Sequence, residues 1–462
     1  MAFDSLPNEL ISVIFAHLYR ISRKEVGRRT YLWSDEKDSD LDMAWKDEDL
    51  LDPWLFPKAI ASVCRRWRAI AESIPFIWTR IVAFVDSSPT PLSQVQAYLA
   101  LSKDLPLHVH VLRRSYINLE WKEERQICRD FINILVPHVR RCQNVEFDVF
   151  YSSSLPSISK DFFGCAPLLE TLNLKCKTDT EVASGGSTPR PEITEESFLT
   201  PALKDLCVDG RNFVHACLAL PSWIESVPKG KLRLSLHNFA PSDLISQDFQ
   251  FTLHDFVLVV DRLKVMRLSL SNVQFHNHAT PAPNIFLSAD TLELDSLCYE
   301  SFIDIMAFIN DEGVESIHIS RCHIEALGFD IYSDFLTLEE IGVDSEISGF
   351  LSDWSGAELR VSDCPGFDDS ALVALGNMED ALIRSLDIKN CPNISPEGVK
   401  KMVQDLNECV VGEYHDGRFD DREKTALHYL SIRGHPHILT PEEEHWFREN
   451  ASSGIFVWTA RK

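Results

Sequence analysis

The chain lacks the segments and the charge that would bind it to a membrane or to nucleic acid. No apolar run approaches the roughly 20 residues that a membrane-spanning helix needs; the longest, 256–260 and 455–458, are strand-sized. Residues Met1–Leu18 lack the basic start of a signal peptide and carry Asp4 and Glu9. Lys and Arg number 45 against 70 Asp and Glu, so a net charge of −25 opposes binding to phosphate backbones or anionic lipids. We therefore expect a soluble protein of the cytoplasm or nucleus, with no membrane or nucleic-acid partner.

Catalytic and metal-binding signatures are also missing. The twelve cysteines include no CxxC pair, and none of GxGxxG, GxxxxGK[ST], GxSxG or HExxH occurs. Histidines gather loosely at His276, His278, His415, His428, His435, His437 and His445. They lack the tight ligand spacing or cysteine partners of a zinc site. We expect a non-enzymatic protein with no cofactor and no metal, and only turnover in a hydrolase screen would favour an enzyme.

The residues that are present predict a folded protein with a sizeable core. Hydrophobic residues make up 45% of the chain, with 27 Phe and 10 Trp, which excludes a mostly disordered protein. Its 462 residues indicate two or three domains or one elongated array. Without a signal peptide, the cysteines are expected to be reduced and mostly buried.

Two short helices are predicted in the first eighty residues. The first opens at Leu6-Pro7-Asn8-Glu9-Leu10, with Pro7 in its first position, where a missing N–H costs nothing. Its apolar residues recur at helical spacing: Leu6, Leu10, Ile14, Phe15 and Leu18. The second is expected to run unbroken from Pro57 to Glu72, with an apolar stripe of Ile60, Val63, Cys64, Trp67, Ile70 and Ile74. Two such helices cannot bury all these side chains on each other, so the surplus needs the rest of the chain or another protein.

These helices resemble the F-box, a small helical module. The matching residues are Leu6-Pro7-x-Glu9-Leu10-x-x-x-Ile14-Phe15-x-x-Leu18 and Val63-Cys64-Arg65-Arg66-Trp67-Arg68-x-Ile70-Ala71, followed by Pro75 and Trp78. An ordinary helical hairpin packed on the next domain is the alternative, but it does not explain why Leu-Pro, Val-Cys and Trp occur together.

Family members usually join the two halves by a short connection, whereas here Tyr19–Phe56 intervenes. The acidic runs 35–42 and 46–49 predict a solvated inserted loop, because like charges repel one another. Trp33, Trp45 and Trp54 leave open that the insertion contains a binding peptide.

From about residue 105 the pattern apolar-x-x-apolar-x-apolar recurs. Its fourth position falls at residues 145, 172, 206, 232, 266, 292, 317, 341, 359 and 386, and most steps lie in the roughly 20–29-residue range of leucine-rich repeats. The step from 341 to 359 is short and predicts a repeat without its helix. Three repeats place a cysteine, expected to be buried, at the following turn: Cys322, Cys364 and Cys391. This pattern resembles the cysteine-containing leucine-rich repeats of many F-box proteins; a β-sandwich is the alternative, but it needs hairpin turns where helix-length segments occur.

The resemblance implies an α/β fold: a helical F-box followed by a curved leucine-rich-repeat solenoid with a parallel sheet on its concave face. We expect an F-box over residues 1–82 with the acidic insertion at about 20–56, then a connecting helical segment over 83–104. The irregular repeat array is expected over 105–412 and a C-terminal cap over 413–462.

The resemblance also implies a function. F-box proteins bind a Skp-type adaptor and so join a cullin–RING ubiquitin ligase, while their repeats hold a protein substrate. The adaptor-binding positions of the family carry over to Leu6, Pro7, Leu10, Ile14, Phe15, Leu18, Val63, Cys64, Trp67, Ile70 and Trp78. The sequence does not divide these residues between the interface and the internal core. A repeat scaffold in a ligase-independent F-box complex is the alternative function.

The substrate is expected on the concave strand face. The candidate residues are Arg233, Arg267, Glu293, Asp295, His318, Asp344, Arg360 and Asp387. Both signs of charge mix along this face, which predicts a protein ligand held by patterned charge. The alternative is that these are only solvated strand residues.

Deleting Arg28–Asp49 should leave binding of the Skp-type adaptor within a few-fold of its original strength, because the acidic loop does not belong to the two helices. Titration calorimetry with the purified adaptor would measure this. Loss of folding after the deletion would show that the insertion is part of the helical core.

Overall fold

The structure is a computed structural model. It describes residues 6–22, 50, 56–114, 120–178, 198–239, 251–275, 286–309, 314–377, 383–413, 427–451 and 454–460. The chain forms two compact units: Met1–Ala183 with Glu195–Leu203, and Ser184–Thr194 with Lys204–Lys462. Within the described residues, no helix is both long and apolar enough to cross a membrane. The insertion's acidic runs and its three tryptophans lie outside the described residues.

The first unit begins with a helical module. Its elements are α1 (Asn8–Ser22), α2 (Lys58–Val63), α3 (Arg65–Glu72) and the 3₁₀ helix η2 (Pro75–Trp78). The carbonyl of Pro7 accepts the first helical hydrogen bond, from the Ile11 N–H at 3.2 Å, so Pro7 precedes the first helical residue rather than occupying it. Helix α1 also runs on through Tyr19–Ser22, which the sequence had assigned to the insertion.

The predicted single helix from Pro57 to Glu72 is wrong, because the chain breaks it at Cys64. The backbone of Cys64 is extended, with φ −159° and ψ 167°, and its sulfur accepts a hydrogen bond from the Trp67 N–H at 3.4 Å. This residue therefore ends α2 and caps α3. The break also divides the predicted stripe: Val63 and Cys64 are exposed, whereas Ile60 and Ile70 are buried.

The core of this module is built from one face of each helix. Its buried residues are Ile11, Phe15, Ile60, Ala61, Ile70, Ala71, Ile74, Ile77 and Trp78. The Phe15 ring meets Trp67 edge-on at 5.2 Å, and the Trp78 indole N–H donates to the Ala71 carbonyl at 2.8 Å. Arg66 joins α3 to the start of α1, since it donates to the Asn8 side chain at 3.0 Å.

A parallel sheet follows directly in the first unit. Its strands, in chain order, are β1 (Arg80–Phe84), β2 (Leu107–Leu112), β3 (Cys142–Tyr151) and β5 (Thr171–Thr178). The sequence placed the first strand at about residue 105, so β1 was missed. The other elements are α4 (Leu92–Leu101), α5 (Trp121–Leu135), η3 (Val136–Arg141), η4 (Ser152–Ser154) and the short pair β4 (Gly164–Cys165) and β6 (Phe198–Leu199).

The second unit is a larger parallel sheet whose strands also follow chain order. They are β7 (Asp205–Asp209), β8 (Arg233–Phe239), β9 (Arg267–Val273), β10 (Thr291–Asp295), β11 (Ser316–Ser320), β13 (Phe335–Glu339), β15 (Glu358–Ser362), β16 (Ser385–Lys389), β17 (Tyr429–His435) and β18 (Ile455–Ala460).

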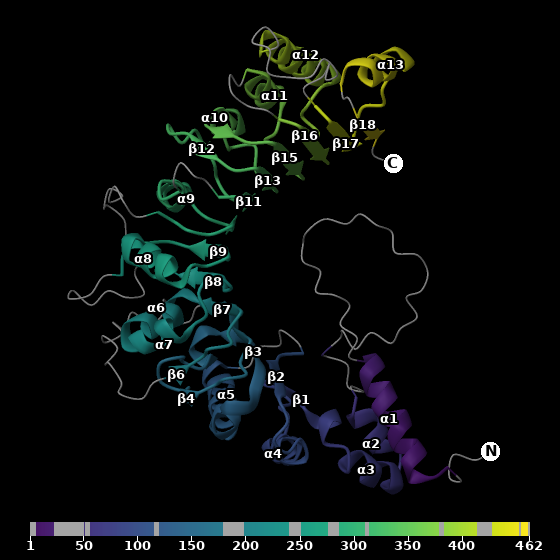
Figure 1. The fold of residues 1–462 in the computed structure, drawn as a ribbon, viewed down its shortest axis with the longest axis vertical. Helices are drawn as coiled ribbons and strands as arrows, with labels where there is room; N and C mark the ends of the chain where they lie inside the picture. The colour runs from purple at the N-terminus through teal and green to yellow at the C-terminus, as the bar shows by residue number, and fades with distance from the viewer. Residues whose placement is uncertain are drawn as a thin grey trace. The chain divides into compact units, whose positions relative to one another are not determined.

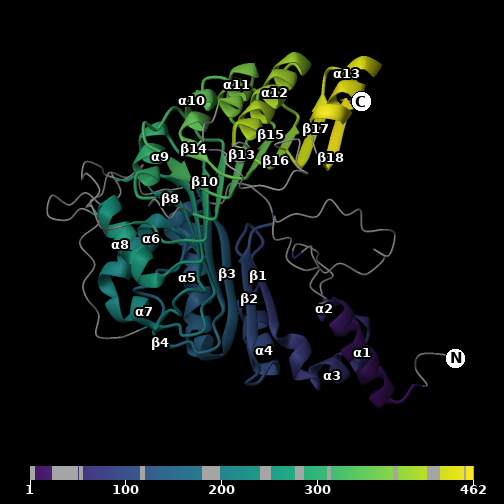
Figure 2. The same cartoon turned by 45° about the horizontal axis from the view of Figure 1, so that its top comes forward.

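Helices cover one face of this sheet, as Figures 1 and 2 show for α8 through α12. The helices of the unit are α6 (Gly210–Ala219), α7 (Pro221–Ser226), α8 (Leu253–Leu263), α9 (Tyr299–Met306), α10 (Ile347–Ser352), α11 (Asp369–Gly376), α12 (Pro396–Glu413) and α13 (Pro441–Asn450). A small second pair of strands joins β12 (Ile331–Tyr332) to β14 (Trp354–Ser355). The architecture is therefore mixed α/β with a large parallel sheet.

A left-handed turn repeats at the same register after successive strands. Each strand of the large sheet from β8 to β16 has two buried apolar residues, such as Leu292 and Leu294 in β10. The residue four positions after the first of them has φ between 50° and 54°. These residues are Asn238, Asn272, Ser296, Arg321, Glu340, Asp363 and Asn390, and Gly434 takes the same place in β17. From Ser296 onward their N–H groups donate to the carbonyl of the next strand, as from Arg321 to Glu339 at 3.1 Å. The turn thus extends the hydrogen-bond ladder beyond the strand.

The structure corrects the predicted register at several repeats. The residue aligned with Leu292 is Leu268, whereas Met266 is exposed. Likewise Ile317 aligns with Leu336 and not with Ile341, which lies in the following turn. The 19-residue step from Ile317 to Leu336 contains no helix, whereas the step that was predicted to lack one contains α10, whose bounds are Ile347–Ser352. Because Leu336, Leu338 and Ile341 are all apolar, the sequence pattern allows either Leu336 or Ile341 to align with Ile317.

The C-terminal segment, predicted as a cap, adds two further strands to the sheet. Strand β17 pairs with β16, and β18 pairs with β17, all in parallel. Helix α13 lies between them in sequence, and its Phe447 ring stacks on Phe456 at 5.3 Å and on Trp458 at 5.6 Å. These aromatic contacts close the apolar layer at the end of the sheet.

The three turn cysteines are buried as predicted. Cys322, Cys364 and Cys391 are at most 3% exposed. The sulfurs of Cys322 and Cys364 accept hydrogen bonds from backbone N–H groups of the preceding repeat, from Leu297 at 3.4 Å and Ile341 at 3.3 Å. Burial raises the pKa of these thiols, to about 11 for Cys322 and Cys391 and about 12 for Cys364.

These environments predict a sharp difference in thiol reactivity. At pH 8, iodoacetamide should alkylate the exposed Cys64 at least about 100-fold faster than Cys364, because only the thiolate reacts and the Cys364 pKa is raised. Peptide mapping by mass spectrometry over a time course would measure both rates. The stabilisation that Cys364 gains from remaining a neutral thiol should be present below pH 9.0, its ordinary pKa, and be lost as the pH rises toward 12. Equal alkylation rates in the folded protein would contradict this assignment.

Candidate interaction surfaces

An exposed group of large apolar side chains lies on α1 and α2. Leu10, Val13, Ile14, Leu18 and Val63 are between 40% and 64% exposed, and we call them the N-terminal apolar patch. Ile11 and Phe15 of the same helix are buried in the core of the module. Helix α1 therefore carries large apolar side chains both in the core and on the surface.

The structure divides the eleven residues that the sequence could not divide. Pro7, Leu10, Ile14, Leu18, Val63 and Cys64 are exposed, and Leu6 and Trp67 are half-buried. Phe15, Ile70 and Trp78 are buried in the module's own core, so they do not reach the surface that a partner would contact. Val13 belongs to the patch and was missed, although it lies three residues after Leu10, which is a helical spacing.

A second surface is formed by the strands of the second unit, on the face away from their buried residues. We call this the strand face. It carries seven of the eight predicted substrate residues, Arg233, Arg267, Glu293, Asp295, His318, Arg360 and Asp387, because side chains alternate along a strand. Asp344 does not lie on the strand face as predicted: β13 ends at Glu339, so Asp344 lies in the turn that follows. The register error at this repeat is the cause, and Thr337 and Glu339 take the strand-face positions instead.

Most charges on the strand face are paired with each other across neighbouring strands. The ion pairs are Arg233–Asp205, Arg267–Glu293 and Arg433–Asp387. His318 also contacts Glu339 at 3.1 Å. For Arg360, burial lowers the pKa of the guanidinium, and this outweighs the nearby carboxylates of Asp387 and Glu358. The mixed charge that the sequence predicted is present, but the surface itself neutralises much of it.

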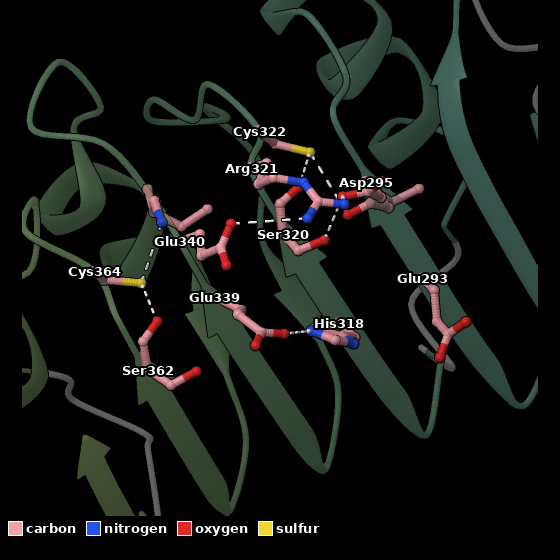
Figure 3. A network of polar contacts seen from close by, with 12 residues as sticks. Glu293, Asp295, His318, Ser320, Arg321, Cys322, Glu339, Glu340, Ser362 and Cys364 are labelled. Carbon is pink, nitrogen blue, oxygen red and sulfur yellow. Dashed lines mark hydrogen bonds and ion pairs between the residues drawn. The ribbon is translucent and has the colours of Figure 1, made fainter. Parts of the chain in front are cut away.

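Asp295 lies at the centre of the best-connected group on this face. Its carboxylate accepts hydrogen bonds from Ser271 at 2.8 Å and Ser320 at 2.7 Å. It also pairs with Arg321 at 2.6 Å, and Figure 3 shows Asp295 beside Ser320 and Arg321. Burial acts to raise the pKa of Asp295, but the bonds from these three partners outweigh it and hold the pKa below the usual value. Arg321 reaches on to Glu340 at 3.7 Å, so the group spans four consecutive strands of the large sheet, from Ser271 on β9 to Glu340 just after β13.

One pair of polar atoms on the strand face is buried without a hydrogen-bond partner. The Asp387 Oδ1 and the Ser431 hydroxyl are both solvent-inaccessible, and the two residues are register partners on β16 and β17. A bridging water suits this arrangement, because one atom accepts and the other can donate.

No metal site emerges from the described residues, where no three His, Cys, Asp or Glu side chains converge. The histidines at 276, 278 and 415 lie outside the described residues. His435 is buried and contacts the Ile394 carbonyl through Nε2 at 3.0 Å, which gives it a structural role between β17 and the start of α12.

Replacing Asp295 by Asn should lower the free energy of unfolding by about 1–2 kcal/mol at pH 7, since the charge-assisted bonds to Arg321 and the two serines weaken. A carboxylate with a lowered pKa stabilises the fold above its ordinary pKa of 3.8 and loses this effect below it, so the difference should shrink as the pH falls below 3.8. Urea unfolding at a series of pH values would measure it. Asp290→Asn, at an exposed carboxyl, is the matched control, and an equal loss in both variants would refute the role of Asp295.

Comparison with known proteins does not assign the chain to a family. No protein-family model matches it, and a search of curated proteins finds none that is similar. Its function must therefore be inferred from the N-terminal apolar patch and the strand face.

Proposed function

We propose that this chain is an F-box protein that recruits a substrate to a Skp–cullin–F-box ubiquitin ligase. In this proposal the N-terminal apolar patch binds a Skp-type adaptor, and the strand face of a leucine-rich-repeat solenoid binds a protein substrate. The observation that carries the proposal is the exposed patch, which lies within the residues that resemble the F-box.

The apolar patch supports an adaptor-sized protein partner. Five large apolar side chains stay exposed on α1 and α2. Their burial against a partner would stabilise a complex by roughly 25 cal/mol for each Å² of apolar surface removed from water. The helices that carry the patch belong to a packed module, because the buried Phe15 ring of α1 contacts the Trp67 ring of α3. Helices held in place before binding lose little conformational entropy on association.

The strand face supports a protein substrate by its regularity. Three features support a leucine-rich-repeat layout: parallel strands in chain order, a left-handed turn after the large-sheet strands from β8 to β17, and buried turn cysteines. The polar side chains of this face hold one another through ion pairs such as Arg433–Asp387 at 2.7 Å. A partner therefore meets a surface whose charges are already ordered, which favours specificity over raw affinity.

The ligase chemistry would belong to other subunits, so this chain positions a substrate and catalyses no step itself. A ligase-independent F-box complex uses the same patch and differs only in whether a cullin is recruited. Co-purification from the native cell, with and without proteasome inhibition, distinguishes the two. A cullin together with the adaptor favours the ligase, and the adaptor alone favours the scaffold.

The double variant Leu10→Asp with Val63→Asp should weaken binding of a purified Skp-type adaptor at least about 100-fold, because two desolvated charges would face an apolar interface. The variant should still fold, since both side chains are exposed in the free protein. Titration calorimetry measures the affinity, and circular dichroism checks the fold. Glu9→Ala, an exposed change on α1 outside the patch, is the matched control.

Adaptor binding of the double variant at the strength of the Glu9→Ala control would refute the F-box proposal. The buried variant Phe15→Ala should behave differently and lower stability by about 3–5 kcal/mol, as expected for loss of a core aromatic.

A further inference from the structure

A cysteine and a histidine lie in contact on the strand face, on the first two strands of the second unit. Cys207 belongs to β7 and His237 to β8, and the Cys207 sulfur lies 3.9 Å from Nδ1 of the His237 ring. Both side chains are half-buried, so part of each stays accessible to solvent. Cys364, by contrast, is fully buried in its turn, where its sulfur contacts backbone groups.

The register of the two strands brings these side chains together. Side chains alternate along β7, so Cys207 and Asp209 share the strand face. In the parallel pairing Cys207 is opposite Ser235, and Asp209 is opposite His237. Because the side chain of Ser235 is small, the imidazole reaches the sulfur across the diagonal between the strands. The contact is thus set by the pairing of β7 with β8.

The imidazole is placed to take the proton of the thiol. Only the thiolate is a nucleophile, and a neighbouring histidine is one of the groups that promote its formation. A neutral imidazole with its proton on Nε2 accepts through Nδ1, which is the nitrogen that faces the Cys207 sulfur. Asp209 is the register partner of His237, and it is fixed there because it caps α6 by accepting the Asn212 N–H at 3.0 Å. It therefore places an acidic residue beside the imidazolium that results.

The other charged residues that β7 and β8 place on this face pair with each other. Arg233 donates to the Asp205 carboxylate at 2.7 Å, so the two charges offset one another. His237 is therefore the group of these two strands that both contacts the sulfur and can change its charge near neutral pH.

We propose that Cys207 is a modification site that forms mixed disulfides with low-molecular-weight disulfides, with His237 as its base. His237 takes the thiol proton, and the Cys207 sulfur attacks one sulfur of the small disulfide. A new S–S bond forms as the old one breaks, and the second half of the small disulfide leaves as a thiolate that takes up the proton. Cys207 is thereby oxidised, and half of the small disulfide is reduced to a thiol.

The consequence for recognition rests on the proposed function. If the strand face binds a protein substrate, an adduct on Cys207 occupies part of that face and obstructs the substrate. The exchange itself needs neither substrate nor adaptor, so its failure would leave the F-box proposal untouched, and the reverse also holds.

Treatment of the full chain with glutathione disulfide tests the proposal, with peptide mapping by mass spectrometry to follow each thiol. Cys298 is the matched comparison, since it is also half-buried but donates to the Ser301 hydroxyl at 3.3 Å. At pH 7, Cys207 should be modified at least about 10-fold faster than Cys298. His237→Gln should remove this difference, whereas His254→Gln, at a half-buried histidine of α8, should leave it in place.

The pH dependence separates a base from a residue that only packs against the sulfur. An ordinary thiol loses roughly 20-fold in rate between pH 8 and pH 6.5, because its thiolate fraction falls. Cys207 should lose less than about 5-fold, and His237→Gln should restore the ordinary dependence. Equal rates for Cys207 and Cys298, or an ordinary pH dependence of Cys207, would overturn the proposal. Both are measured on the unsubstituted chain, so they decide the question even if His237→Gln does not fold.

Discussion

The second unit depends on the in-register parallel pairing of its strands. Each strand of the large sheet from β8 to β16 contributes two buried apolar residues that align with those of the neighbouring strand. Leu292 and Leu294, for example, pair with Ile317 and Ile319. Because side chains alternate, the same register that stacks the apolar residues also aligns the polar ones on the opposite face. The left-handed turns, the buried cysteines and the ion pairs of the strand face all follow from this one alignment.

The helical module of the first unit solves a different problem. Three short helices cannot bury every apolar side chain that they carry, so the fold decides which of them form the core. In the second half of the motif, the extended backbone at Cys64 separates α2 from α3. Val63 is exposed there, whereas Ile60 and Ile70 are buried in the core. An exposed apolar patch on a rigid base is the result, and it is this physical property that makes a protein partner the natural interpretation.

Charge is distributed unevenly in this acidic chain. On the strand face, arginines and carboxylates of neighbouring strands neutralise one another, as Arg433 and Asp387 do. That surface is therefore characterised by regularly spaced ion pairs and not by an excess of one charge. Just after β1, the buried carboxylate of Asp86 is paired with Arg114 through both of its oxygens. Net charge alone therefore describes neither surface.

The sequence by itself determined the two α-helical halves of the N-terminal motif, the α/β character of the repeats and the burial of Cys322, because each depends on local periodicity. Only the tertiary structure decided the rest. It chose between two apolar alignments at Leu336 and Ile341, since both satisfy the same pattern and only pairing with β11 separates them. It also separated exposed Leu10 from buried Phe15, because this outcome depends on contacts between residues far apart in the chain.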